Sequence, residues 1–228
     1  MAWLFAFYRS QLGKKAIMAV TGFMLFGFVL GHMIGNLKLY QGAEKLNDYA
    51  EFLRNLGAPV FGPYEALWIA RIGLLAAVGL HILMAYQLTQ LNRRARPQAY
   101  AKKVPQKSTY ASRTMRWGGI IIVLFIVYHL LHFTTGTVHS DFIKYDVYHN
   151  VVTGFQNPLI SAFYIVANLA LGFHLYHGLW SMVHSLGLSG PRVDPLREKA
   201  AVAFAVIITA ANISFPVSVL TGIVTLSG

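Results

Sequence analysis

The sequence contains no cysteine, few acidic residues and few charged residues of any kind. The absence of cysteine excludes disulfides, iron–sulfur ligation and thiolate–metal ligation by this chain. Only 8 acidic residues accompany 19 basic ones, and the resulting net charge of +11 could suggest a nucleic-acid partner. Charged residues, however, make up only 12% of the 228 residues, whereas hydrophobic residues make up 56%. This balance is typical of an integral membrane protein with basic loops and no nucleic-acid partner.

Five long apolar stretches divide the chain, and each is long enough to cross a bilayer as a helix. They are predicted at residues 16–36, 64–91, 117–136, 158–187 and 200–226. The fifth is expected to be interrupted by Pro216. Residues 37–63 contain an amphipathic surface helix that ends near Gly57, and residues 137–157 form a second, aromatic-rich surface segment. No soluble domain is left over, so residues 1–228 are predicted to form one all-α transmembrane unit.

Lysine and arginine are distributed unevenly among the connections. The N-terminal segment and the connections after the second and fourth spans hold 14 basic residues, eight of them in residues 92–116. The two other connections hold four. Because basic residues concentrate on the cytoplasmic side, the N-terminus is predicted inside and the C-terminus outside. Residues 92–116 contain no acid, so this loop is predicted to dock acidic groups of partner proteins or lipid phosphates.

Histidines lie inside four of the five spans. Ionisable groups at bilayer depth are costly and are retained mainly for function, so these side chains are expected to face the bundle interior and bind something there. The candidates are His32, His81, His129, His132, His174 and His177. Arg71, inside the second span, is expected either to pair with an anionic group or to extend toward the membrane surface.

The depths of these histidines fall into two layers when they are measured along each helix from its outer end, at about 1.5 Å per residue. His32 and His129 lie roughly 6 and 10 Å from that end, and His81 and His174 roughly 27 and 24 Å. An outer layer would pair the first and third spans. An inner layer, roughly 15–20 Å away, would pair the second and fourth. Two stacked haems, each clamped between two helices, fit these layers.

Two choices stay open at this point. Depth separates neither His129 from His132 nor His174 from His177, because span ends are uncertain by several residues. Zinc or copper would need ligands that converge at one depth, which two separated pairs do not provide. The remaining histidines are predicted near the surface as interfacial or hydrogen-bonding residues, namely His139, His149 and His184.

Glycines recur beside two of these histidines. Gly27, Gly31 and Gly35 are spaced by four residues along the first span, which favours either close helix approach or room for a flat cofactor beside His32. Gly178 follows His174 by four residues and leaves that face of its helix bare.

Residues 162–187, AFYIVANLALGFHLYHGLWSMVHSLG, resemble the FH…GLWS…WG run of the cytochrome b558 family. Weaker matches are VLGHMIGN in the first span, GLHILMAYQL in the second and LFIVYHLLHF in the third. The similarity covers nearly the whole chain. This family comprises the five-helix, di-haem membrane anchors of succinate:quinone oxidoreductases (respiratory complex II) and fumarate reductases.

The resemblance implies two haems b, each with two axial histidines, from helices one plus three and two plus four. Carried over by motif position, the iron ligands are His32 with His129 and His81 with His174. This assignment agrees with the two layers. His132 and His177 are then alternates near the iron or a quinone, and Arg71 is a candidate partner for a haem propionate.

The resemblance also implies partners and a pathway. A flavoprotein subunit with FAD and an iron–sulfur subunit would dock on the cytoplasmic face of a bacterial inner membrane. Electrons from succinate would pass through them to the inner haem, the outer haem and a membrane quinone, with menaquinone expected. This chain would contribute no catalytic residue of its own. A higher oligomer is left open.

One departure from the family pattern and three rival functions accompany this interpretation. Some fumarate reductases of the family carry an intramembrane Glu two residues before the ligand in the fourth span, where this chain has Gly172, so a proton route through that Glu is not carried over. The rivals are the reverse reaction from quinol to fumarate, a haem b anchor of a hydrogenase or formate dehydrogenase, and a haem-free channel or transporter.

Overall fold

The computed structural model describes residues 2–95, 110–185, 190–191 and 193–226. Their regular structure is entirely helical, as expected from the sequence. The elements are α1 (Ala2–Arg9), α2 (Gln11–Asn36), a 3-10 turn (Leu37–Gln41), α3 (Ala43–Arg54), α4 (Glu65–Arg94), α5 (Tyr110–His129), a π turn (Leu130–Thr134), α6 (Val147–Gln156), α7 (Pro158–Ser185) and α8 (Val193–Leu220). Five helices are long and apolar enough to cross a membrane, which confirms the predicted all-α membrane fold: α2, α4, α5 with its π turn, α7 and α8.

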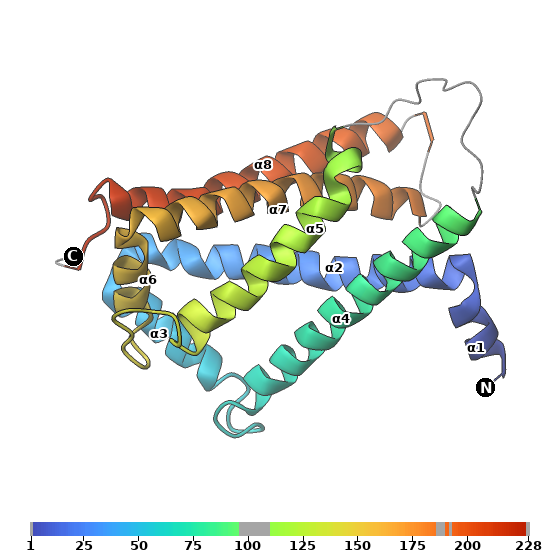
Figure 1. Cartoon of the computed structure of the whole chain (residues 1–228). Coiled ribbons are helices and arrows are strands. Elements are labelled where there is room, and N and C mark those ends of the chain that lie inside the picture. The colour runs from blue at the N-terminus through green and yellow to red at the C-terminus, as the bar shows by residue number, and fades with distance from the viewer. Residues whose placement is uncertain (1, 96–109, 186–189, 192, 227–228) are drawn as a thin grey trace.

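The spans form a bundle whose centre is α2 packed with α7 and α8 (Figure 1). The α4 helix packs along α2, and α5 crosses α7. Within the described residues, α4 makes no extensive backbone contact with α5 or α7. Side chains from α4 and α7 that meet must therefore reach across the space between these helices.

The connections separate into two ends of the bundle (Figure 1). One end holds α1, the C-terminal end of α4 and the start of α8. The opposite end holds α3 and α6. We call these the α1 end and the α3/α6 end. This alternation is what five consecutive spans require.

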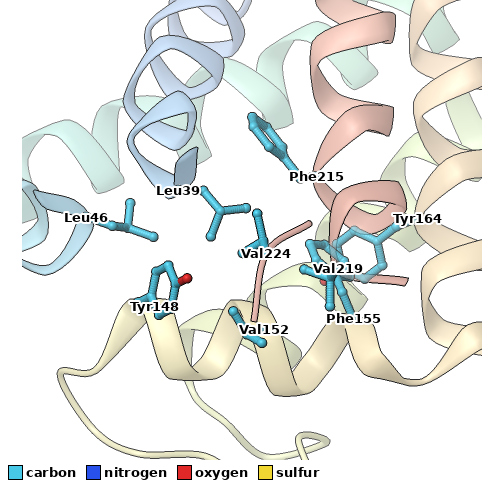
Figure 2. Packing of buried hydrophobic residues seen from close by; sticks show 9 residues of the cluster. All are labelled: Leu39, Leu46, Tyr148, Val152, Phe155, Tyr164, Phe215, Val219 and Val224. Atoms are coloured by element: carbon cyan, nitrogen blue, oxygen red, sulfur yellow. The ribbon is translucent and has the colours of Figure 1, made fainter. Parts of the chain in front are cut away.

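The best-packed core lies at the α3/α6 end (Figure 2). It joins the 3-10 turn, α3, α6, α7, α8 and the segment after α8, through Leu39, Leu46, Tyr148, Val152, Phe155, Tyr164, Phe215, Val219 and Val224. Residues 137–157, predicted as a surface segment, therefore contribute α6 to the core. The reason is that the aromatic residues of α6, like Leu46 of α3, bury their side chains against the ends of α7 and α8.

The fifth span is predicted at residues 200–226, whereas α8 begins at Val193 and ends at Leu220. Its first two turns are rich in charged residues, and Arg197 there pairs with Asp194 at 3.1 Å and lies over the ring of Trp180 at 4.8 Å. A hydropathy pattern cannot count such turns as part of a span. The predicted interruption at Pro216 is also wrong, since the helix continues through this buried residue and loses only one backbone donor.

Candidate functional site

The first pair of rings joins α4 and α7. The imidazole centres of His81 and His174 lie 6.3 Å apart, with their planes at 62°. The Nδ1 atom of His81 lies 3.2 Å from the hydroxyl of Thr21 on α2. That hydroxyl donates to the carbonyl of Ile17 at 2.8 Å, so it is placed to accept from His81. This bond leaves Nε2 of His81 as the nitrogen available to a metal.

The second pair joins α2 and α5. The imidazole centres of His32 and His129 lie 5.9 Å apart, with their planes nearly perpendicular at 87°. Phe28 stacks on His32 at 5.3 Å and Phe125 packs against His129 at 5.6 Å. The aromatic neighbours give this pair an apolar surround that limits the access of water.

Both separations suit two axial ligands of one metal ion. A metal–nitrogen bond of about 2 Å on each side, plus about 1 Å from each nitrogen to its ring centre, places two such imidazole centres roughly 6 Å apart. The observed 5.9 and 6.3 Å match this value. Two neutral imidazoles are suitable axial ligands for haem iron.

The two pairs lie at different depths. Thr21, which contacts His81, precedes His32 on the straight helix α2 by about eleven residues, or roughly 16 Å at the rise of an α-helix. His32 and His129 lie near the α3/α6 end of their helices, whereas His81 and His174 lie nearer the α1 end. We call these the outer pair and the inner pair.

The exposed fractions of His129 and His132 differ, and this difference distinguishes the two histidines as possible metal ligands. The side chain of His32 is exposed within the chain, and His129, His81 and His174 are partly exposed, so protein atoms leave part of each ring uncovered. His132 is only 1% exposed. Protein atoms surround its ring, and no room remains for a metal centre beside it.

A π turn begins directly after His129, and the rings of His129 and His132 meet different histidines although both contact the hydroxyl of Tyr164. On a regular helix, residues three apart face nearly the same way. Here α5 ends at His129 and continues as the π turn Leu130–Thr134, a geometry that often occurs at functional sites. His129 faces His32, whereas His132 stacks on His139 at 4.8 Å. Hydropathy carries no signal for this change of pitch.

The other predicted site residues lie outside the two pairs. His177 packs near Trp180 at 6.2 Å. Arg71 lies over the ring of Trp68 at 5.1 Å. His139 is buried and hydrogen-bonded rather than interfacial, because α6 covers it. His149 bonds Asp141 at 2.9 Å. The side chain of His184 and residues 96–109 of the basic loop lie outside the described part of the chain.

The glycines divide between the two expected roles. A methyl group at Gly35 would lie 2.5 Å from the ring of Tyr49, so this position serves close packing. At Gly27, Gly31 and Gly178, no described atom lies within 4 Å of such a methyl group, which suits a flat cofactor. Gly172 packs directly against Thr209 of α8. This contact leaves no space for a larger side chain at position 172.

Two polar residues near the pairs escaped the sequence analysis, namely Thr21 and Tyr164. Both lie inside spans, and a hydroxyl at bilayer depth was the available signal. It is a weak one, because Ser, Thr and Tyr in membrane helices often bond only their own backbone or a neighbouring helix.

Comparison with known proteins assigns the chain to a family. Residues 89–213, more than half of the chain, match the family described as "Succinate dehydrogenase/Fumarate reductase transmembrane subunit". The chain belongs to this family. It is also 23% identical over 162 residues to the succinate dehydrogenase cytochrome b558 subunit of Bacillus subtilis (strain 168), an alignment that covers 71% of this chain and 73% of the relative. No solved structure matches the chain significantly.

Membership of the succinate dehydrogenase/fumarate reductase transmembrane subunits confirms the resemblance found in the sequence. The protein is a multi-pass membrane subunit of a complex of this family. The matched region includes α5, α7 and most of α8, and so contains one histidine from each of the two pairs.

Proposed function

We propose that this chain is the cytochrome b anchor of a succinate dehydrogenase, holding two haems b and delivering electrons to a membrane quinone, with menaquinone as the expected acceptor. The observation that carries the proposal is the presence of two histidine pairs, each about 6 Å between ring centres, at two depths of one bundle. The haem-binding character of the relative's name, cytochrome b558, supports the same conclusion.

The proposed ligands are His32 with His129 for the outer haem and His81 with His174 for the inner haem. A bis-histidine haem b, when bound, supplies one-electron transfer without changing its ligands. The chain's own residues supply the imidazoles, fix the tautomer of His81 through Thr21, and keep water from the rings with Phe28 and Phe125. Uncovered glycine faces beside these helices support a flat cofactor rather than a bare metal ion.

The proposed orientation places the α1 end in the cytoplasm. The eight basic residues of 92–116 support this orientation, because they lie at the end of α4, in the connection to α5 and in the first turns of α5. A flavoprotein subunit and an iron–sulfur subunit would dock at that end, next to the inner pair. The quinone would accept electrons beyond the outer pair.

The test is the haem content of the purified complex. The wild-type complex is expected to hold two low-spin haems per chain, and His81→Ala and His174→Ala should each lower the ratio to about one by removing the same haem. His32→Ala and His129→Ala should each remove the other haem. His177→Ala serves as the matched control and should keep both.

Three outcomes would contradict the proposal. A wild-type spectrum without haem would favour a channel or transporter. Co-purification with hydrogenase or formate dehydrogenase subunits would assign the chain to another complex. Retention of two low-spin haems in His174→Ala, together with loss of one in His177→Ala, would change the inner ligand.

A further inference from the structure

A buried tyrosine lies between two histidines beside the outer pair. The hydroxyl of Tyr164, on α7, lies 3.0 Å from Nδ1 of His132 and 3.4 Å from Nδ1 of His129. Tyr164 is 3% exposed and His132 is 1% exposed. Buried polar groups are costly unless they are hydrogen-bonded, so the three side chains stabilise one another in this apolar bundle.

The proposed role of His129 as an iron ligand determines which atoms of His129, Tyr164 and His132 carry protons. If Nε2 of His129 binds iron, its Nδ1 carries a proton and can only donate, so the oxygen of Tyr164 must accept. The Tyr164 hydroxyl then donates to Nδ1 of His132, whose lone pair accepts. The hydrogen bonds therefore run in one direction, from His129 through Tyr164 to His132.

The neighbours of His132 hold its ring in place as the last acceptor in this series of hydrogen bonds. Its ring stacks on His139 at 4.8 Å, with the planes 22° apart. Nδ1 of His139 accepts from the amide of Asp141 at 3.1 Å, so Nε2 carries the proton and donates to the carbonyl of Asn150 at 2.9 Å. A methyl group on Gly154 would lie 2.9 Å from Cε1 of His132, so α6 packs closely against this ring. These contacts hold the His132 ring beside Tyr164.

We propose that Tyr164 and His132 are positioning residues for the outer ligand His129. The Tyr164 hydroxyl orients the imidazole and, by accepting its Nδ1 proton, makes Nε2 a stronger donor to iron. A stronger donor stabilises ferric over ferrous haem, so the pair lowers the reduction potential of the outer haem. This inference rests on the proposed function, in which His129 holds that haem.

The test is a redox titration of the complete complex carrying Tyr164→Phe. Phenylalanine keeps the packing and removes only the hydroxyl. The haem that His32→Ala removes is expected to rise in reduction potential, with a changed electron paramagnetic resonance signal of its ferric form, while the other haem is unchanged. Retention of the inner haem would show that the variant is folded. Loss of the outer haem alone would show that binding of this haem, and not only its potential, depends on the Tyr164 hydroxyl.

The matched control is Tyr128→Phe. Its ring lies 6.1 Å from that of Tyr164, so the variant removes a hydroxyl from the same aromatic cluster. It should leave both potentials unchanged. His132 is the last acceptor in this series of hydrogen bonds. The variant His132→Gln keeps an acceptor for the Tyr164 hydroxyl and should shift the potential of the outer haem less than His132→Leu.

Two results would overturn the inference while leaving the proposed function intact. One is two haems with unchanged potentials and spectra in Tyr164→Phe. The other is an equal shift in Tyr128→Phe, which would make the effect one of general polarity. A wild-type complex without haem would instead overturn the proposed function itself.

Discussion

Thr21 is a single hydroxyl that links three features of the inner pair. It donates to its own helix at Ile17, accepts from His81, and lies on α2, the helix that carries the outer ligand His32. Its partner His81 belongs to α4, which packs along α2. The backbone contact between these helices therefore helps to fix the orientation of an imidazole that meets a third helix, α7, at His174.

We predict that Thr21→Val raises the reduction potential of the haem that His81→Ala removes. Valine keeps the shape but cannot accept from Nδ1, so the imidazole becomes a weaker donor to iron. A net hydrogen-bond energy of about 1 kcal/mol corresponds to roughly 40 mV for a one-electron couple. Redox titration monitored by optical spectra measures the shift. Thr21→Ser keeps the hydroxyl and should leave the potential near that of the wild type; an equal shift in both variants would contradict the role of the hydrogen bond.

The contact between α7 and α8 depends on one residue without a side chain. Gly172 lies directly against Thr209. The two helices also share the buried residues Leu175, Ala205 and Ile208. A side chain at position 172 would therefore push the two helices apart or displace Thr209.

We predict that Gly172→Ala destabilises the protein by about 1–3 kcal/mol, the usual cost of overpacking. The loss should appear as a lower thermal unfolding temperature in detergent. The control is Gly79→Ala on α4, where no described atom lies within 4 Å of the added methyl group. Because the clash is with the Thr209 side chain, Thr209→Ala should restore part of the stability of Gly172→Ala. No rescue would mean that the backbone itself is displaced.

The whole molecule has two chemically different ends. Because the chain contains no cysteine, a single introduced cysteine can report which side of the membrane each end faces. We predict that a cysteine introduced at Gln106, in the basic connection between α4 and α5, reacts with a membrane-impermeant thiol reagent only from the cytoplasmic side. A cysteine at the exposed position Ser140, in the connection that precedes α6, should react only from outside. The reversed pattern would invert the orientation and exchange the inner and outer haems.

The order of electron transfer follows from the same asymmetry. If the soluble subunits dock at the α1 end, succinate should still reduce the inner haem in His32→Ala but should fail to reduce the outer haem in His81→Ala. The physical reason is the gap of roughly 16 Å between the pairs, which adds to the distance from the iron–sulfur clusters. Rapid mixing of succinate with complexes that retain their soluble subunits measures both rates. Normal reduction of the outer haem in His81→Ala would exclude this order.

The sequence by itself determined the membrane fold and the helices that carry the site. Apolar runs long enough to cross a bilayer are a strong signal, because each must satisfy its backbone hydrogen bonds internally as a helix. Histidines within such runs are rare enough to mark a site, and helix rise placed His32 at the depth of His129 or His132 and His81 at the depth of His174 or His177. Motif position in the resembling family then selected His129 and His174. The family match confirms the resemblance seen around His174. The ligand assignment itself stays a prediction.

Depth along the helices left His129 and His132 equivalent, and the tertiary structure shows which of the two rings meets His32. After the π turn the ring of His132 stacks on His139 rather than on His32, and a change of helical pitch leaves no trace in hydropathy. The ends of α8 and the burial of α6 were also missed, because they depend on contacts between segments far apart in the chain. Thr21 and Tyr164 gain their roles in the same way, since each supports a histidine on another helix.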